Sequence, residues 1–224
     1  MDVARVAVAI MAKAPKPGEV KTRLCPPLSP EEAADLYDCF LRDKVAQVRT
    51  LGGAAGVIAF TPDDRRSLFE EIAPGFRLIA QRGADLGSRL LNSLGALLRD
   101  GYVGAIAIDS DTPNLPTDYL RQAVELLGKP ATDVVVGPSD DGGYYLIGVR
   151  QAWPALFDAM PWSTAEVLPE TLRRAKAEGL RVECLPAWFD VDTPDDLERL
   201  IVSLAERDDG APLHTRRFLR RRGR

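Results

Sequence analysis

Short apolar runs alternate with amphipathic segments along most of the chain, and this alternation constrains the fold more than any other feature. The apolar runs, rich in Val, Ile and Ala, span residues 3–11, 56–60, 76–80, 103–108, 134–136, 144–149 and 180–185. Helices are expected over residues 29–50, 63–73, 85–99, 116–127, 163–178 and 193–207. Strands that alternate with helices predict a three-layer α/β fold with a mostly parallel sheet and helices on both faces. We expect residues 1–207 to form one domain, because no gap is long enough for a linker.

Local patterns refine this expectation. Segments beginning at Ser29, Ser163 and Thr193 carry the sequence of a helix capping box, in which an acidic residue follows the cap after three positions. The run over residues 144–149 follows the preceding run too closely for a crossover helix. We therefore expect an antiparallel strand there, in an otherwise parallel sheet.

Charge is distributed unevenly along the chain. The net charge is −4, but residues 214–224 carry six Arg and no acidic residue. Without those six, the chain has 23 basic and 33 acidic residues, a balance that disfavours general nucleic-acid binding. We expect residues 208–224 to form a flexible, solvated basic tail, with RNA or anionic lipid contact as the alternative.

Composition also excludes several kinds of chemistry. The single histidine, His214, lies in the basic tail, which excludes Ser-His-Asp catalysis and His-based zinc sites. The three cysteines are far apart without a Cys-x-x-Cys motif, which predicts a reducing, cytoplasmic location without disulfides. No apolar stretch is long enough to span a membrane. Oligomeric state leaves no signature in the sequence.

A basic loop follows the first apolar run directly. Four cations fall within residues 13–23, with Gly18 among them. Positive side chains and accessible backbone amides bind phosphate groups, so this loop is a candidate phosphate site. Lys21 and Thr22 resemble the end of a Walker A loop, but no glycine precedes the lysine, which excludes that motif. A solvated surface loop is the alternative.

Two acidic corners follow predicted strands. Asp109 and Asp111 end the fourth apolar run, and paired carboxylates at such a position suit Mg²⁺ or Mn²⁺. Simple turn formation is the alternative. Asp190 and Asp192 precede the last predicted helix, whose capping does not require them, so they are candidates for the same metal. Pro113 stands where aspartate-nucleophile phosphatases have Thr or Val, which excludes that class.

A third candidate feature is the predicted turn over residues 138–143. Asp140 and Asp141 precede Gly142 and Gly143 there. This order brings carboxylates and accessible backbone close to a ligand. A tight turn between two strands explains the same residues without a function.

Five segments, in this order, resemble a known family. They are residues 11–24, 109–113, 137–148, 161–164 and 190–197. Together they resemble the DUF2064 family of radical-SAM-associated glycosyltransferases, within the nucleotide-diphospho-sugar transferase (GT-A) superfamily. The resemblance covers residues 3–205. It implies a GT-A fold that binds a nucleotide and a divalent cation, Mg²⁺ or Mn²⁺.

The resemblance also implies roles for particular residues. The implied nucleotide- and phosphate-binding residues are Lys13, Gly18, Lys21, Thr22 and Arg23. The implied metal ligands are Asp111 as the direct ligand, Asp109 and Asp192. The residues implied to line the donor or acceptor pocket are Asp141, Gly142, Gly143 and Trp162. Asp141 or Asp140 would accept the proton of the acceptor.

The expected activity is metal-dependent transfer of a sugar from a nucleoside-diphosphate sugar to a small acceptor. The metal, Lys21 and Arg23 would stabilise the negative charge of the leaving diphosphate. The alternative is a nucleotidyltransferase, because residues 20–24 also resemble the phospholactate guanylyltransferases, although the pyrophosphorylase signature Gly-x-Gly-Thr-Arg is absent. A non-catalytic nucleotide-binding protein is the third interpretation.

Overall fold

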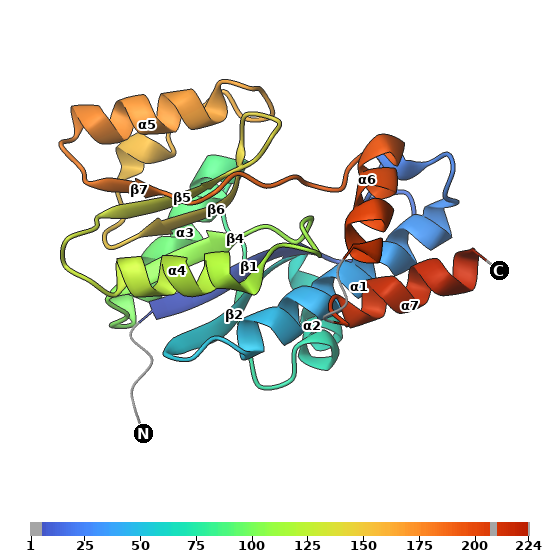
Figure 1. The fold of residues 1–224 in the computed structure, drawn as a ribbon. Coiled ribbons are helices and arrows are strands. Elements are labelled where there is room, and N and C mark those ends of the chain that lie inside the picture. Colours follow the sequence, from blue (N-terminus) through green and yellow to red (C-terminus); the bar gives the residue numbers. More distant parts are fainter. Residues whose placement is uncertain (1–5, 207–209, 224) are drawn as a thin grey trace.

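The computed structural model describes residues 6–206 and 210–223, and its centre is a seven-stranded sheet (Figure 1). The strands are β1 (Val6–Lys13), β2 (Ala54–Thr61), β3 (Arg77–Ala80), β4 (Gly104–Ile108), β5 (Val134–Pro138), β6 (Tyr144–Val149) and β7 (Val182–Cys184). Their order is β3-β2-β1-β4-β6-β5-β7. Only the pairings of β6, with β4 and with β5, are antiparallel among these strands. The predicted mixed, mostly parallel sheet and its antiparallel strand are confirmed.

Helices cover both faces of the sheet. They are α1 (Pro30–Arg49), α2 (Arg66–Ile72), α3 (Leu86–Arg99), α4 (Thr117–Leu127), α5 (Val167–Ala177), α6 (Pro194–Ala205) and α7 (Leu213–Arg222). Short 3-10 turns are η1 (Thr22–Leu24), η2 (Asp63–Arg65) and η3 (Pro154–Leu156). None of the described helices is both long and apolar enough to cross a membrane.

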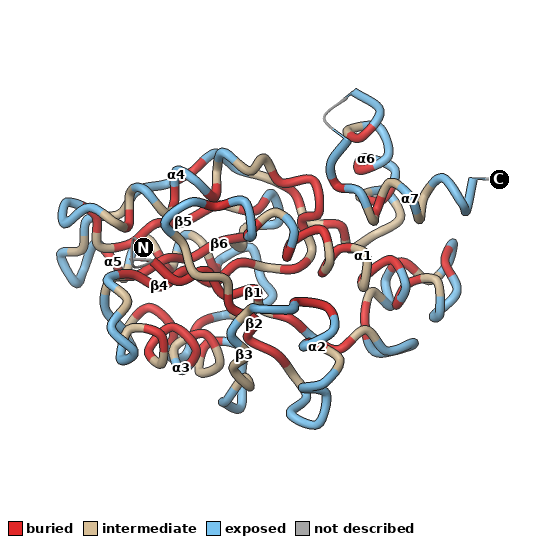
Figure 2. Tube along the Cα trace, turned by 90° about the horizontal axis from the view of Figure 1, so that it is seen from below, coloured by how far each residue is buried: buried red, intermediate tan, exposed pale blue. Residues whose placement is uncertain are grey.

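The central strand shows how the two faces are built. In β1, Val8 and Ile10 point into a core shared with α1, α4 and α6, whereas Ala7 and Ala9 point into a core shared with α3 and α5. Side chains alternate across a strand, so one buried apolar run serves both layers. Figure 2 shows the resulting buried centre, with the sheet strands largely red. The predicted three-layer architecture is confirmed.

Two of the three predicted capping boxes form. Ser29 caps α1 and Thr193 caps α6, each by accepting a hydrogen bond from the amide three residues on. The box predicted at Ser163 does not form: α5 begins at Val167, and Ser163 has φ +63°. The amide of Glu166, which the box would use, donates to Thr164 Oγ1 (3.3 Å). The amide of Leu168 donates to the carbonyl of Gly142 in the β5–β6 turn (2.9 Å), so a tertiary contact fixes the start of α5.

The basic C-terminal segment is a docked helix over residues 213–222, which corrects the expectation of a flexible tail. Helix α7 packs along α1 (Figure 1). The buried carboxylate of Asp43 accepts hydrogen bonds from the His214 amide (2.9 Å), the Thr215 amide (2.8 Å) and Thr215 Oγ1 (2.7 Å). A side chain of α1 therefore supplies the cap that the local sequence of α7 lacks.

Some predictions fall outside the described residues. They concern the start of the first strand at residues 3–5, the end of the last predicted helix at residue 207, and the domain boundary between residues 207 and 208.

Candidate functional site

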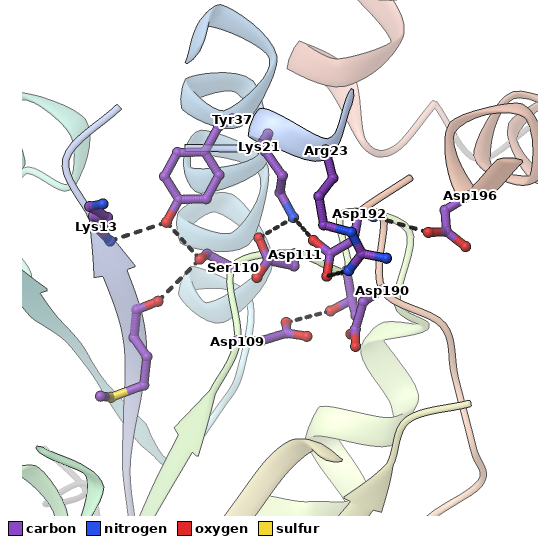
Figure 3. Close-up of polar contacts among 12 residues, drawn as sticks. Lys13, Lys21, Arg23, Tyr37, Asp109, Ser110, Asp111, Asp190, Asp192 and Asp196 are labelled. Atoms are coloured by element: carbon purple, nitrogen blue, oxygen red, sulfur yellow. Dashed lines mark hydrogen bonds and ion pairs between the residues drawn. The ribbon is translucent and has the colours of Figure 1, made fainter. Parts of the chain in front are cut away.

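The predicted site segments meet at one edge of the sheet. Strands β1 and β4 are parallel neighbours, so the basic loop after β1 and the acidic corner after β4 lie side by side. The segment before α6 joins them, because the amide of Val191 donates to the carbonyl of Asp111 (2.9 Å). Figure 3 shows the carboxylates of Asp109, Asp190 and Asp192 around this point.

Lys21 is the centre of the arrangement. Its Nζ lies 2.5 Å from Asp111 Oδ1 and 2.8 Å from Asp192 Oδ1, and its side chain is only 4% exposed. Burial lowers the pKa of Lys21, but the charges of Asp111 and Asp192 outweigh it and raise the pKa above its ordinary value. The ammonium is therefore charged and bridges two corners that are far apart in sequence.

The backbone of Lys21 is held in an unusual conformation. Its φ of 49° and ψ of 34° place it in the left-handed region, which costs a non-glycine residue about 1–2 kcal/mol. The Leu24 amide closes the turn by donating to the Lys21 carbonyl (2.9 Å), and Leu24 is fully buried. Tertiary packing therefore maintains a local strain that aims the lysine into the site.

The other predicted phosphate-binding residues lie on the outer side of this loop. The side chain of Arg23 is 70% exposed, with Nη1 at 3.9 Å from Asp192 Oδ2. Lys13 Nζ donates to the carbonyl of Glu19 (2.9 Å). Gly18 has φ +75°, which explains a glycine there, and Thr22 begins η1. Arg23 is thus the loop cation best placed to meet a ligand beside the carboxylates.

Part of the loop backbone is unavailable to phosphate. Pro15 and Pro17 have no N–H group. The amide of Ala14 donates to the Thr61 carbonyl (2.8 Å), and the amide of Glu19 donates to the Lys16 carbonyl (3.0 Å). Among the described residues, no acceptor is found for the amides of Lys16, Gly18 and residues 20–23, so these amides could bind phosphate together with the cationic side chains.

Asp109 lies deeper than Asp111 and faces Asp190 (Figure 3). It accepts a hydrogen bond from Thr112 Oγ1 (2.7 Å), and Asp190 accepts one from Ser139 Oγ (2.6 Å). Among the described residues, no donor reaches the buried atoms Asp109 Oδ2 and Asp190 Oδ1. Burial, and then the charge of Asp109, raise the pKa of Asp190 well above its usual range. A proton on Asp190 therefore relieves the repulsion between the two groups.

Sequence reasoning missed Lys44 and the polar role of Tyr37. Lys44 is fully buried on the apolar face of α1, with Nζ 4.0 Å from Asp109 Oδ1. Burial lowers its pKa to about 8, although Asp109 opposes this. The hydroxyl of Tyr37 contacts Ser110 Oγ (2.8 Å) and accepts from the Lys13 amide (3.1 Å). A lysine at a core position of the helical repeat was the available signal for Lys44.

The two predicted proton acceptors lie on the opposite rim. Asp140 pairs with Arg199 (2.8 Å), and Asp141 Oδ1 accepts from the Gly143 amide (2.9 Å). Both line a cavity of about 110 Å³ that Arg23 and the acidic segment before α6 also line. The lining residues are Arg23, Ser139, Asp140, Asp141, Phe189, Asp190, Asp192, Asp196 and Arg199. The structure thus brings three separate predicted segments to one cavity.

Trp162 and Gly142 have packing roles. The ring of Trp162 lies edge-on to that of Tyr144, with centroids 6.3 Å apart, and Trp162 is not among the residues that line the cavity. Gly142 has φ +89°, and a Cβ there would lie 2.5 Å from Ala165 Cα. Its lack of a side chain therefore lets the β5–β6 turn pack against the segment before α5. The roles of Trp162 and Gly142 in a donor pocket stay predictions.

The carboxylates fit a metal that completes its coordination with substrate phosphates. The side chains of Asp111 and Asp192 are 35% and 42% exposed, and their oxygens are the hard donors that Mg²⁺ and Mn²⁺ prefer. In the described parts of the chain, no group of three His, Cys, Asp or Glu side chains is arranged to hold a metal. Mg²⁺ commonly takes one or two carboxylates and completes its coordination with substrate phosphates and water. Asp111 and Asp192 match that mode of binding.

The chain is similar in sequence and in fold to several known proteins. The family described as "Uncharacterized protein conserved in bacteria (DUF2064)" matches residues 44–164. A crystal structure from Desulfovibrio desulfuricans G20, described as a "putative nucleotide-diphospho-sugar transferase", is 32% identical with a TM-score of 0.90. The match covers 98% of this chain and 95% of that one.

Two further relatives have names that refer to nucleotidyl transfer or to a bound nucleotide. A 2-phospho-L-lactate guanylyltransferase from Haloarcula marismortui is 29% identical over 198 residues, covering 88% of this chain and 85% of the relative. The structure of a CMP:2-keto-3-deoxy-manno-octonic acid synthetase complexed with CTP has a TM-score of 0.56 at 15% identity. That match covers 90% of this chain and 99% of the other, and it shows a shared fold.

Proposed function

The chain belongs to the DUF2064 family, and for this member we propose metal-dependent transfer of a sugar from a nucleoside-diphosphate sugar to a small acceptor. One observation carries the proposal: Asp111 and Asp192, from two distant corners, converge on a single cationic position at the carboxyl ends of the strands. Ligands of open α/β sheets bind at this edge.

The charges around this position suit a leaving diphosphate. Asp111 and Asp192 would hold Mg²⁺ or Mn²⁺, and the metal would supply positive charge to the diphosphate oxygens. Lys21 and the exposed Arg23 would add donors to the same oxygens as negative charge develops. Buried Lys44 and Asp190 would keep Asp109 fixed behind them.

Asp140 and Asp141, on the rim of the cavity, are the candidate bases for the acceptor. Asp141 is the better of the two candidate bases, because Asp140 already pairs with Arg199. Asp141 keeps one oxygen on the Gly143 amide, which orients the carboxylate. A hydroxyl bound in the adjacent cavity would transfer its proton to this group as the new bond forms.

A relative that spans nearly the whole chain favours sugar transfer over nucleotidyl transfer. The crystal structure described as a "putative nucleotide-diphospho-sugar transferase" is 32% identical, and the match covers 98% of this chain. The pyrophosphorylase signature Gly-x-Gly-Thr-Arg is absent from the loop. Nucleotidyl transfer is the second candidate, favoured by the guanylyltransferase relative that covers most of the chain.

Thermal unfolding against a ligand panel separates these candidates. The panel holds UDP-, GDP-, dTDP- and ADP-sugars, the free diphosphates and all nucleoside triphosphates, each with Mn²⁺, Mg²⁺ or EDTA. A ligand at about 100 times its Kd adds about 2.7 kcal/mol, or about 5 to 10 °C for a chain of this length. Sugar transfer predicts a metal-dependent shift with one nucleoside-diphosphate sugar.

Variants make the test specific to the site. Asp111→Asn should abolish the shift, whereas Asp118→Asn, an exposed aspartate on α4, should retain it. A shift with triphosphates alone, with pyrophosphate released when phosphorylated acceptors are added, would replace sugar transfer by nucleotidyl transfer. No shift with any nucleotide would contradict both.

A further inference from the structure

We infer that Lys21 is an internal counter-cation: it neutralises Asp111 and Asp192 in the metal-free protein, and a divalent metal must displace it before the substrate is held. This inference rests on the proposed function and adds an order of binding to it, with the metal before the substrate. Metal binding would release the ammonium, and the released ammonium would then face the phosphates.

The Lys21 ammonium and the metal would compete for the same two carboxylate oxygens. The ammonium contacts Asp111 Oδ1 at 2.5 Å and Asp192 Oδ1 at 2.8 Å, and these oxygens are the proposed metal donors (Figure 3). Mg²⁺ sits about 2.0–2.1 Å from each oxygen ligand. An ion bridging the same two oxygens would occupy the space of the ammonium, and two positive charges at that separation repel each other strongly.

No other loop cation holds both carboxylates among the described residues. Lys13 and Lys16 pair with Glu19, away from the two corners. Arg23 reaches only the second oxygen of Asp192, at 3.9 Å, and its side chain is largely exposed. Lys21 alone is buried between them, and its Nζ lies 5.8 Å from the centre of the Phe40 ring.

The release of Lys21 requires little rearrangement of the chain. Leu24, fully buried, and its hydrogen bond to the Lys21 carbonyl fix the backbone of the turn. The four-carbon side chain of Lys21 can rotate on that fixed base. Asp111 and Asp192 are each more than a third exposed, so an ion can approach from the open side while the lysine leaves. Metal and nucleotide should therefore bind cooperatively.

The first test measures Mn²⁺ affinity from the electron paramagnetic resonance signal of the free ion, without nucleotide. Lys21→Met keeps most of the length of the side chain and removes its charge, so its Mn²⁺ affinity should rise by about tenfold or more. Lys176→Met, on the exposed face of α5, should equal the wild type. An unchanged or weaker affinity in Lys21→Met overturns the inference.

The second test follows the wild-type lysine itself. Amine acylation read by mass spectrometry should be slow at Lys21 in EDTA, because the ammonium is buried and doubly paired. It should become faster with Mg²⁺, while Lys129 and Lys176 keep their rates. Protection that is unchanged at saturating Mg²⁺ overturns the inference.

Failure of the inference and failure of the proposed function give different results. Mn²⁺ binding that depends on Asp111 but is indifferent to Lys21→Met contradicts only the inference. Mn²⁺ binding in none of these proteins, with or without nucleoside diphosphates, contradicts the proposed metal-dependent function itself.

Discussion

Asp43 should be one of the most important side chains for holding the C-terminal helix on the domain. Its buried carboxylate accepts three hydrogen bonds from His214 and Thr215 at the start of α7. Asp43→Ala would leave two backbone amides and a hydroxyl without that acceptor. Each buried donor left unsatisfied costs about 1–3 kcal/mol, and the loss of a helix cap alone costs about 0.5–2 kcal/mol.

Water reaching the exposed start of α7 offsets part of this cost, so we expect a net loss of about 2–4 kcal/mol. For a chain of this length, that corresponds to a fall in Tm of about 4–16 °C. Asp43→Asn should lie between the alanine variant and the wild type, because its amide keeps one acceptor oxygen.

Urea unfolding followed by circular dichroism measures the change in free energy, and limited trypsin digestion reports on the arginine-rich helix directly. Asp35→Ala, an exposed position on the same helix, is the matched control. Early cleavage within residues 213–222 of Asp43→Ala, but not of the control, would show that α7 undocks. Equal stability and equal protection of the two variants would refute the assigned capping role.

Two further predictions concern stability. Gly142→Ala should cost more than Gly179→Ala, because both glycines have positive φ but only at residue 142 would the new Cβ meet backbone atoms within 3 Å; equal losses in thermal unfolding would contradict this. Hydrogen bonds from Arg181 hold the pKa of Asp133 at about 2, below its unfolded value near 4, so this pair should stabilise the fold above about pH 4 and lose its effect toward pH 2. The difference in unfolding free energy between wild type and Asp133→Asn should shrink over that range, and a constant difference would count against the pair.

Local sequence predicted much of the fold because most of its signals are local. The capping boxes at Ser29 and Thr193 and the antiparallel course of β6 each depend on residues close together in the chain. The failures have tertiary causes. Helix α7 takes its cap from Asp43, about 170 residues away, and the segment after Ser163 packs on the β5–β6 turn.

In the candidate site, too, local motifs were predicted and tertiary contacts were not. Lys21, Asp111 and Asp192 were proposed from motifs at strand ends, and parallel pairing brings such motifs together. Their shared ion pair, however, depends on how three loops pack, which no pattern in the sequence specifies. Lys44 was missed because its place on the apolar face of α1 marks a core residue, and only the structure shows Asp109 opposite it.

Calorimetric titration tests most directly whether Asp111 and Asp192 serve a metal-bound diphosphate. The nucleoside-diphosphate sugar with the largest thermal shift is titrated into wild type and into Asp111→Asn. The titration is run with Mn²⁺ and with EDTA. We predict that affinity falls by about tenfold or more when either the metal or the Asp111 carboxylate is removed, and that removing both adds little. Equal affinity in all four titrations would show that the convergence of Asp111 and Asp192 does not serve a metal-bound diphosphate.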